Sequence, residues 1–182
     1  DIVGEFKKTF KVPIGFDTDV HASLLGEATW GAAKGIKNAI YMTVGTGVGL
    51  GILAEGSLVH GMLHPEAGHI LLRPHPQDTF SGRCPYHKNC FEGLACGPAV
   101  EERWGEKGIE LAQKDEVWEL GAYYIAQALY NYILIISPEI IILGGGIMQQ
   151  EKLFGLIRKE IERLNGSYLL TRELKSLDTY IV

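Results

Sequence analysis

Two cysteines and a histidine recur at intervals of three residues near the middle of the chain, as Cys84, His87 and Cys90. Thiolate and imidazole groups at this spacing can converge on one tetrahedral ion, and they are the ligands that zinc prefers. Residues 74–85 are rich in proline and glycine and have no apolar periodicity, so we expect them to need such a crosslink. A closed structural site requires a fourth ligand, for which the candidates are His69, which we favour, His64 and His75. The alternative is a surface loop with two unpaired thiols.

The composition fits one globular domain and argues against several classes of partner. The chain has 182 residues, 46% of them hydrophobic, which is enough to bury a sizeable core. It carries 17 basic and 22 acidic residues, a net charge of −5, and no basic stripe, so we expect no nucleic acid and no membrane surface as partner. No apolar run is long enough to span a bilayer, and we expect no signal peptide. Three cysteines, an odd number, suit a reducing compartment, so we expect a cytoplasmic protein.

The order of apolar patterns predicts an α/β fold with a mixed sheet flanked by helices. The run Glu139–Leu143 is continuously apolar after its first residue, which is typical of a strand buried on both faces. Strands are predicted at residues 12–16, 39–44, 48–53, 58–60 and 139–143, with further short strands considered at 69–72 and 180–182. Helices are predicted at residues 1–11, 17–33, 98–104, from about 117 to the residue before Pro138, and 152–164.

Two glycine clusters follow predicted strands. The first, Gly45-Thr46-Gly47-Val48-Gly49-Leu50-Gly51, lies between two strands, where it forms either a plain tight hairpin or a backbone cradle for phosphate oxygens. It is neither a Walker loop nor a Rossmann fingerprint, because it lacks the Gly-Lys-Ser/Thr ending and a strand follows it. The second, Gly144-Gly145-Gly146, ends the buried strand, where it is either a simple turn or a surface on which a flat base can lie.

Acidic residues in three places are candidates for chemistry. Asp17 and Asp19 stand where a helix is predicted to begin, and we interpret Asp17 as a helix cap. Asp19 is the candidate for a base that accepts a hydroxyl proton during phosphoryl transfer. Glu66 and Glu92 flank the cysteine cluster, where they are either solvated surface acids or ligands of paired sugar hydroxyls.

Taken in order, these motifs resemble the ROK family of repressors and sugar kinases. They are the hairpin glycines, Glu66-Ala67-Gly68-His69, the Cys/His/Cys cluster with Glu92, and Ile142-Leu143-Gly144-Gly145-Gly146. The resemblance covers nearly the whole chain and implies a ribonuclease H-like fold of the actin and hexokinase type. The stretches Cys84–His87 and Gly97–Gly105 are similar to the bacterial zinc-containing fructokinase branch of that family.

The resemblance implies ATP-dependent phosphorylation of a hexose. We expect the hexose to be fructose and the product to be fructose 6-phosphate. It implies that Asp19 deprotonates the sugar hydroxyl, that Zn²⁺ is structural and that Mg²⁺ accompanies ATP. It implies sugar binding by Glu66, His69 and Glu92, and metal binding by His69, Cys84, His87 and Cys90. Nucleotide binding is implied for Gly45, Thr46, Gly47, Gly49, Gly144, Gly145 and Gly146.

Three features depart from the family pattern. Thr18 and His21 stand where asparagine is usual, and the opening phosphate motif Asp-x-Gly-Gly-Thr is absent. We therefore expect residues 1–37 to end a first lobe, with the catalytic Asp on an interlobe helix, and residues 38–182 to form the second lobe with the zinc loop 84–90. On this interpretation the isolated chain is inactive and the protein forms a homodimer. The alternative is the sugar-binding lobe of a ROK transcriptional regulator.

Overall fold

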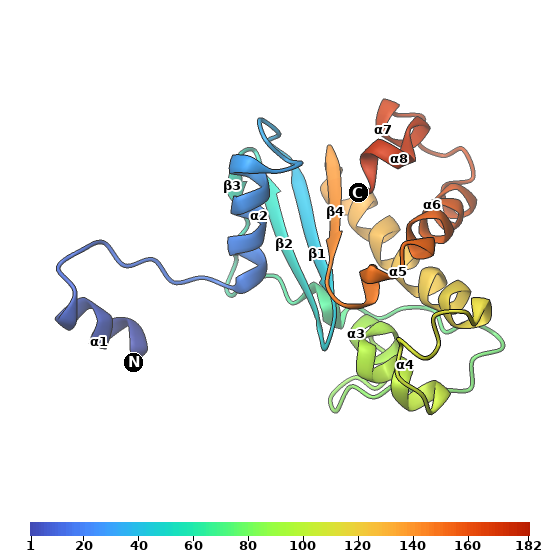
Figure 1. The fold of residues 1–182 in the computed structure, drawn as a ribbon. Coiled ribbons are helices and arrows are strands. Elements are labelled where there is room, and N and C mark those ends of the chain that lie inside the picture. Colours follow the sequence, from blue (N-terminus) through green and yellow to red (C-terminus); the bar gives the residue numbers. More distant parts are fainter.

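A four-stranded mixed sheet forms the centre of the computed structural model, which describes residues 1–182 (Figure 1). Its strands are β1 (Ala39–Val44), β2 (Val48–Ala54), β3 (Ser57–Leu58) and β4 (Ile140–Gly144), in the spatial order β3-β2-β1-β4. The β1–β2 pair is an antiparallel hairpin, whereas β4 runs parallel to β1 with Thr43 opposite Gly144. Strands β1 and β4 therefore end at the same edge of the sheet, and both glycine clusters lie at that edge.

Helices cover both faces of the sheet, as the continuous apolar character of β4 predicts. Helix α2 (Asp19–Trp30) packs on one face, and α5 (Asp115–Ile136) and α6 (Lys152–Asn165) pack on the other (Figure 1). The sheet has a hydrophobic core on each face, and alternate residues of β4 pack into the two cores. Ile140 and Ile142 pack into the smaller core beneath α2, and Ile141 and Leu143 pack into the larger core beneath α5. No helix has the length and apolar character needed to cross a lipid bilayer.

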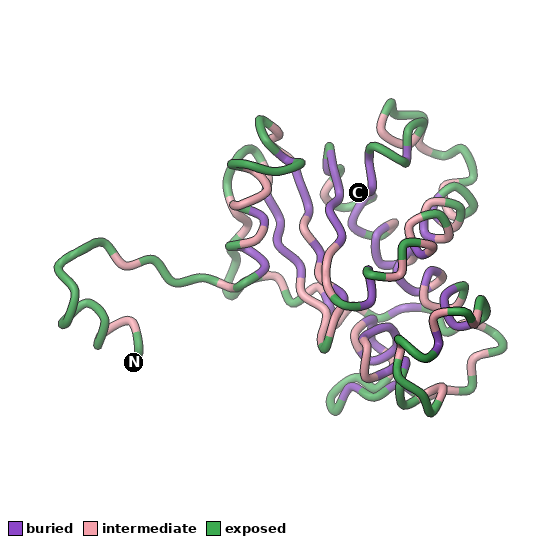
Figure 2. Tube along the Cα trace, viewed as in Figure 1, coloured by how far each residue is buried: buried purple, intermediate pink, exposed green.

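Short elements and loops lie at the hairpin end of the sheet and at the two ends of the chain. Near the hairpin are η1 (Ala67–His69), α3 (Phe91–Ala95), α4 (Gly97–Trp104) and η2 (Ile147–Gln149). The chain ends with α7 (Arg172–Lys175) and α8 (Leu177–Tyr180). Helix α1 (Ile2–Thr9) buries no residue, and Figure 2 shows it and the following segment lying apart from the body.

A buried ion pair anchors the loop that precedes the cysteine cluster. Arg103 on α4 contacts Asp78 at 3.1 Å, with side chains only 8% and 4% exposed. The hydroxyl of Tyr124 on α5 donates to the same carboxylate at 2.5 Å, and Arg103 also donates to the carbonyl of Leu94 at 2.9 Å. Because these partners come from α3, α4 and α5, the pair holds the aperiodic loop against three helices.

Most predicted elements are confirmed within a few residues, and the differences have local causes. The strand predicted at residues 12–16 is wrong, because these residues pair with no strand and Pro13 offers no N–H donor. The strand considered at 69–72 is also wrong: His69 lies in a 3₁₀ turn, and Leu71 forms one isolated bridge to Cys90. The strand considered at 180–182 is reduced to one bridge, between Ile181 and Ile141. Helix α3 was not predicted, since five residues are too few to display a helical period.

Two glycine-to-alanine variants test how closely α2 packs on the sheet. A Cβ atom on Gly51 would lie 2.7 Å from the backbone oxygen of Val20, so Gly51→Ala must push α2 away from β2. We expect this variant to lower the free energy of unfolding by about 1–3 kcal/mol. Gly155 lies exposed inside α6 with nothing near its added Cβ, so Gly155→Ala should raise the same quantity by about 0.5–1 kcal/mol. Urea denaturation measures both, and a neutral Gly51→Ala would contradict the packing.

Candidate active site

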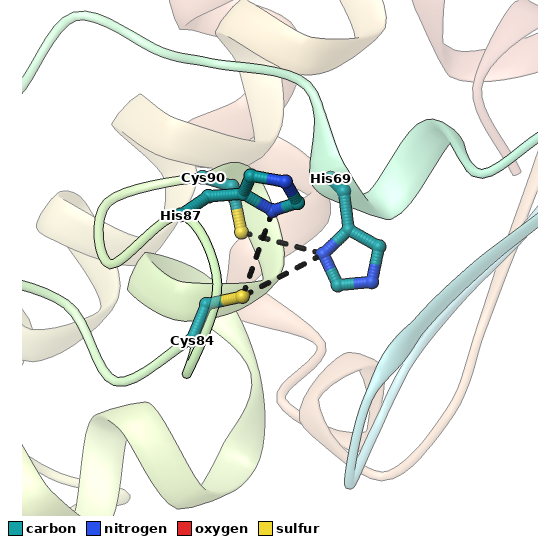
Figure 3. Close-up of side chains that lie close together, drawn as sticks. All are labelled: His69, Cys84, His87 and Cys90. Atoms are coloured by element: carbon teal, nitrogen blue, oxygen red, sulfur yellow. Dashed lines mark hydrogen bonds between the residues drawn. The ribbon is translucent and has the colours of Figure 1, made fainter.

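Four side chains converge beside the sheet, from η1 and from the loop that leads into α3. They are His69, Cys84, His87 and Cys90, and Figure 3 shows both sulfur atoms facing the Nδ1 atom of His69. The separations are 3.5 Å from Cys90 Sγ to His69 Nδ1, 3.8 Å from Cys84 Sγ to the same atom, and 3.7 Å from Cys84 Sγ to His87 Nδ1. The predicted ligand set is thus brought together, with His69 in the fourth position.

These separations match those expected around one zinc ion. With Zn–S bonds of about 2.3 Å and Zn–N bonds of about 2.0–2.1 Å, tetrahedral angles place a sulfur and a nitrogen ligand about 3.6 Å apart. All four ligand atoms lie within 4.8 Å of one another, and both cysteines are buried. A donor set of two thiols and two imidazoles is one that zinc favours, so the residues fit a closed structural site.

The surroundings of the two thiols shift their pKa values in opposite directions. Burial raises the pKa of the Cys90 thiol to about 11. Burial also acts to raise the pKa of Cys84, but hydrogen bonds from the backbone of His87 and Tyr86 outweigh it, and the pKa of Cys84 is lowered. The tight turn from Cys84 to Lys88 therefore makes the Cys84 thiol more acidic than the Cys90 thiol.

The other two candidate histidines make contacts elsewhere. His64 Nε2 lies 2.8 Å from a carboxylate oxygen of Glu66, and His75 packs edge-on against Tyr123. Neither belongs to the four-residue cluster. Of the three candidates for the fourth ligand, His69 is therefore the one that the fold presents to the thiols.

The second nitrogen of His69 faces two carboxylates. Its Nε2 atom lies 4.0 Å from an oxygen of Glu66 and 4.0 Å from an oxygen of Glu92. Both distances exceed a direct hydrogen bond, and both leave room for one bridging oxygen atom. His69 thus presents one nitrogen to the candidate metal centre and the other to a group of polar atoms open to solvent.

The glycine hairpin and the second glycine cluster meet at one cavity. A hollow of about 600 Å³ is lined by Gly45 and Thr46 from the hairpin and by Gly146 from the second cluster. Gly144 and Gly145 are not among its lining residues; Gly145 adopts φ 94°, which is the left-handed conformation needed for the turn after β4. Sequence reasoning assigned no ligand-binding role to the remaining lining residues: three lie in the stretch Gly97–Gly105, which carried only the family resemblance, and the others come from segments with no motif. They are Gly97, Pro98, Glu101, Lys107, Gly108, Ile109, Trp118, Ile147, Gln149 and Gln150.

Helix α2 brings Asp19 next to the hairpin. Val20, the next residue, packs against Gly49 and Gly51 of β2, and the Asp19 carboxylate remains exposed. The helix cap is Thr18, whose hydroxyl accepts from the backbone N–H of His21 at 3.2 Å. The interpretation of Asp17 as the cap is therefore wrong.

Asp17 instead joins two histidines. Its carboxylate lies 2.6 Å from His21 Nδ1 and 2.8 Å from His60 Nε2, and the bond from buried His21 is the main cause that lowers the pKa of Asp17 to about 2. Two ligands of a tetrahedral ion with bonds of about 2.0–2.1 Å would lie about 3.3 Å apart. These separations are shorter and match hydrogen bonds, so the group ties the segment at His60 to the start of α2.

Comparison with known proteins agrees with this architecture. The sequence model of the ROK family matches residues 1–176. A protein of Bacillus subtilis (strain 168), provisionally named a fructokinase, is 52% identical over 177 residues, covering 97% of this chain and 59% of that protein. The fructokinase of Streptococcus mutans serotype c (strain ATCC 700610 / UA159) is 43% identical over 185 residues, covering 100% of this chain and 61% of the relative.

The crystal structure of the ROK hexokinase from Thermus thermophilus superposes with a TM-score of 0.81 at 24% identity, covering 98% of this chain and 70% of that one, which supports the fold. The chain spans about three fifths of the length of the two curated relatives. With a family match over nearly its whole length, the chain belongs to the ROK family.

Proposed function

We propose that this chain is part of an ATP-dependent hexose kinase whose substrate is fructose and whose product is fructose 6-phosphate. The observation that carries the proposal is the position of His69, between a zinc-type ligand cluster and two carboxylates at 4.0 Å. The fructokinase names of relatives that are 43–52% identical support the choice of reaction and sugar.

The polar group around His69 has the chemistry of a sugar site. Carboxylates accept hydrogen bonds, and one hydroxyl can bridge a carboxylate and an imidazole nitrogen that lie 4.0 Å apart. Glu66, His69 and Glu92 together offer several such positions, as a polyhydroxyl substrate requires. We propose these three residues as the sugar-binding set.

The nucleotide is proposed to bind along the hairpin edge of the sheet. Gly45, Thr46, Gly47 and Gly49 would hold its phosphates, and the cavity lined by Gly146 would take the adenosine. Gly144 and Gly145 would support that surface through the turn they form. The carboxyl edge of β1 and β4 is where open α/β sheets commonly bind ligands, which supports this arrangement.

Asp19 is proposed as the base that accepts the proton of the sugar hydroxyl as the phosphoryl group is transferred. Its carboxylate is exposed at the start of α2, one residue from the contact of Val20 with Gly49. Because α2 packs directly against the sheet, the Asp19 carboxylate is held at a defined distance from the hairpin. Mg²⁺, when bound with ATP, would supply charge neutralisation at the phosphates.

Zinc is proposed as a structural ion held by His69, Cys84, His87 and Cys90. When bound, it would supply four fixed ligand directions to a segment with little regular structure. The side chains of this chain then do the binding: His69 is oriented by its Nδ1 atom and offers Nε2 to the sugar.

The protein would be a cytoplasmic homodimer that takes neither nucleic acid nor membrane as partner. Residues 1–37 would mark the junction between two lobes, which is supported by the separation of α1 from the body, and residues 38–182 would form the second lobe. A ROK regulator lobe is the weaker alternative, because the two relatives at 43–52% identity carry kinase names.

A panel of hexoses tests the reaction. A protein of the relatives' length that contains this sequence should transfer phosphate from ATP with Mg²⁺ to fructose faster than to glucose or mannose. Coupled detection of ADP measures the rates, and phosphate position is read by NMR of the product. Absence of turnover with every hexose would refute the proposed function.

Removing the proposed base should suppress turnover and leave sugar binding in place. In that protein, Asp19→Asn keeps the shape of the side chain and removes its basicity, so kcat should fall by about 100- to 10,000-fold. Asp115→Asn is the matched control, because Asp115 is likewise the first residue of a helix, and its kcat should stay at the wild-type value. Unchanged turnover in Asp19→Asn would remove Asp19 from the mechanism.

Metal analysis tests the zinc centre directly on the 182-residue chain. Protein purified without chelator should contain about one zinc per chain, and Cys84→Ser should lower that content because the site loses a thiolate ligand. Cys96→Ser is the control: Cys96 is buried but lies outside the cluster, so zinc content should not change. An equal zinc content in both variants would contradict the assignment.

A further inference from the structure

Helix α3 connects the candidate metal centre to the glycine hairpin over a distance of only five residues. Cys90, a proposed metal ligand, is the N-cap of α3, and Phe91 anchors the helix in the core with no exposed surface. Immediately beyond the other end of the helix, the backbone N–H of Gly97 donates to the carbonyl of Gly45 at 2.7 Å. The two ends of this short segment thus contact the metal centre and the first residue of the hairpin.

Glu92, in the first turn of α3, makes a second contact with the hairpin. One carboxylate oxygen accepts a hydrogen bond from the backbone N–H of Val48 at 3.0 Å. The same oxygen would lie 2.8 Å from a Cβ atom on Gly47, so the carboxylate lies closely against the hairpin backbone. The other oxygen is the one that lies 4.0 Å from His69 Nε2. Glu92 therefore has one oxygen on the hairpin and one directed to the metal-facing histidine.

The opposite side of Val48 is also in contact with the segment that carries His69. A Cβ atom on Gly68 would overlap the carbonyl oxygen of Val48, so η1 packs directly on the hairpin backbone. The hairpin is thus held at Gly45, at the Val48 N–H and at the Val48 carbonyl, and each of these contacts comes from a segment next to a proposed metal ligand.

We propose that Glu92 is a positioning residue, which fixes the hairpin through the Val48 N–H and couples the hairpin's conformation to occupancy of the metal centre. This proposal rests on the proposed function, which assigns phosphate binding to the hairpin. A metal that orders Cys90 and His69 also orders α3 and η1, and with them the amide that Glu92 holds. By reciprocity, a nucleotide that binds the ordered hairpin strengthens metal binding by the same factor.

Amide hydrogen exchange of the zinc-loaded 182-residue chain tests the contact without requiring activity. Glu92→Ala removes the acceptor, so exchange of the Val48 N–H should speed up by roughly tenfold or more. Glu92→Gln keeps an acceptor oxygen and should stay within about threefold of wild type, which separates the hydrogen bond from the charge. Glu102→Ala, an exposed acid on α4, is the matched control and should leave the Val48 rate unchanged. The Leu143 N–H of edge strand β4, bonded to the Val182 carbonyl at 2.7 Å, is the reference amide, because it lies on a strand that makes no contact with Glu92.

Removal of zinc from wild type with a chelator supplies the second arm, which needs no variant to fold. The Val48 N–H should then exchange faster than in the loaded protein by a larger factor than the Leu143 N–H. The proposal is overturned if Glu92→Ala exchanges at the wild-type rate, or if zinc removal changes both amides by the same factor. ATP titration is read separately: absence of nucleotide binding in the kinase-length protein counts against the proposed function, whereas the Val48 rate decides the role of Glu92.

Discussion

The convergence of two thiols and two imidazoles is the constraint on which the rest of the site depends. Residues 59–90 contribute only a three-residue 3₁₀ turn to regular structure, so backbone hydrogen bonds alone fix little of their path. The four ligand atoms lie at the separations of a tetrahedral ion, and they join η1 to the start of α3. Because the Nδ1 atom of His69 is part of this group, its position also fixes the direction in which the Nε2 atom of the same ring points.

The sheet supplies the second half of the site through its topology. Parallel pairing of β1 with β4 places Gly45 beside Gly146, so two glycine clusters that lie about a hundred residues apart in the sequence share one cavity. Helix α2 is packed so closely on β2 that Gly51 leaves no space for a side chain. The segment that carries His69, the glycine hairpin and Asp19 are therefore all held against the same edge of the sheet, each by a different kind of contact.

The sequence predicted the parts whose signal lies in a pattern or a motif. The continuous apolar run 139–143 identified a strand buried on both faces, and the spacing of Cys84, His87 and Cys90 identified side chains that converge in the structure. Contacts between segments without a motif could not be predicted. The ion pair of Asp78 with Arg103 joins residues that look like ordinary surface charges, and the bond from Glu92 to Val48 depends on a five-residue helix with no visible period. The cap at Thr18 was missed because three consecutive residues, Asp17 to Asp19, could each have served.

X-ray absorption at the zinc edge of the purified chain tests the central claim most directly, because it reports the identity and distance of the ligands. The geometry described here predicts two sulfur neighbours at about 2.3 Å and two nitrogen neighbours at about 2.0–2.1 Å. A spectrum with only oxygen and nitrogen neighbours, or protein that binds no zinc when the metal is supplied, would contradict a metal-ordered sugar loop.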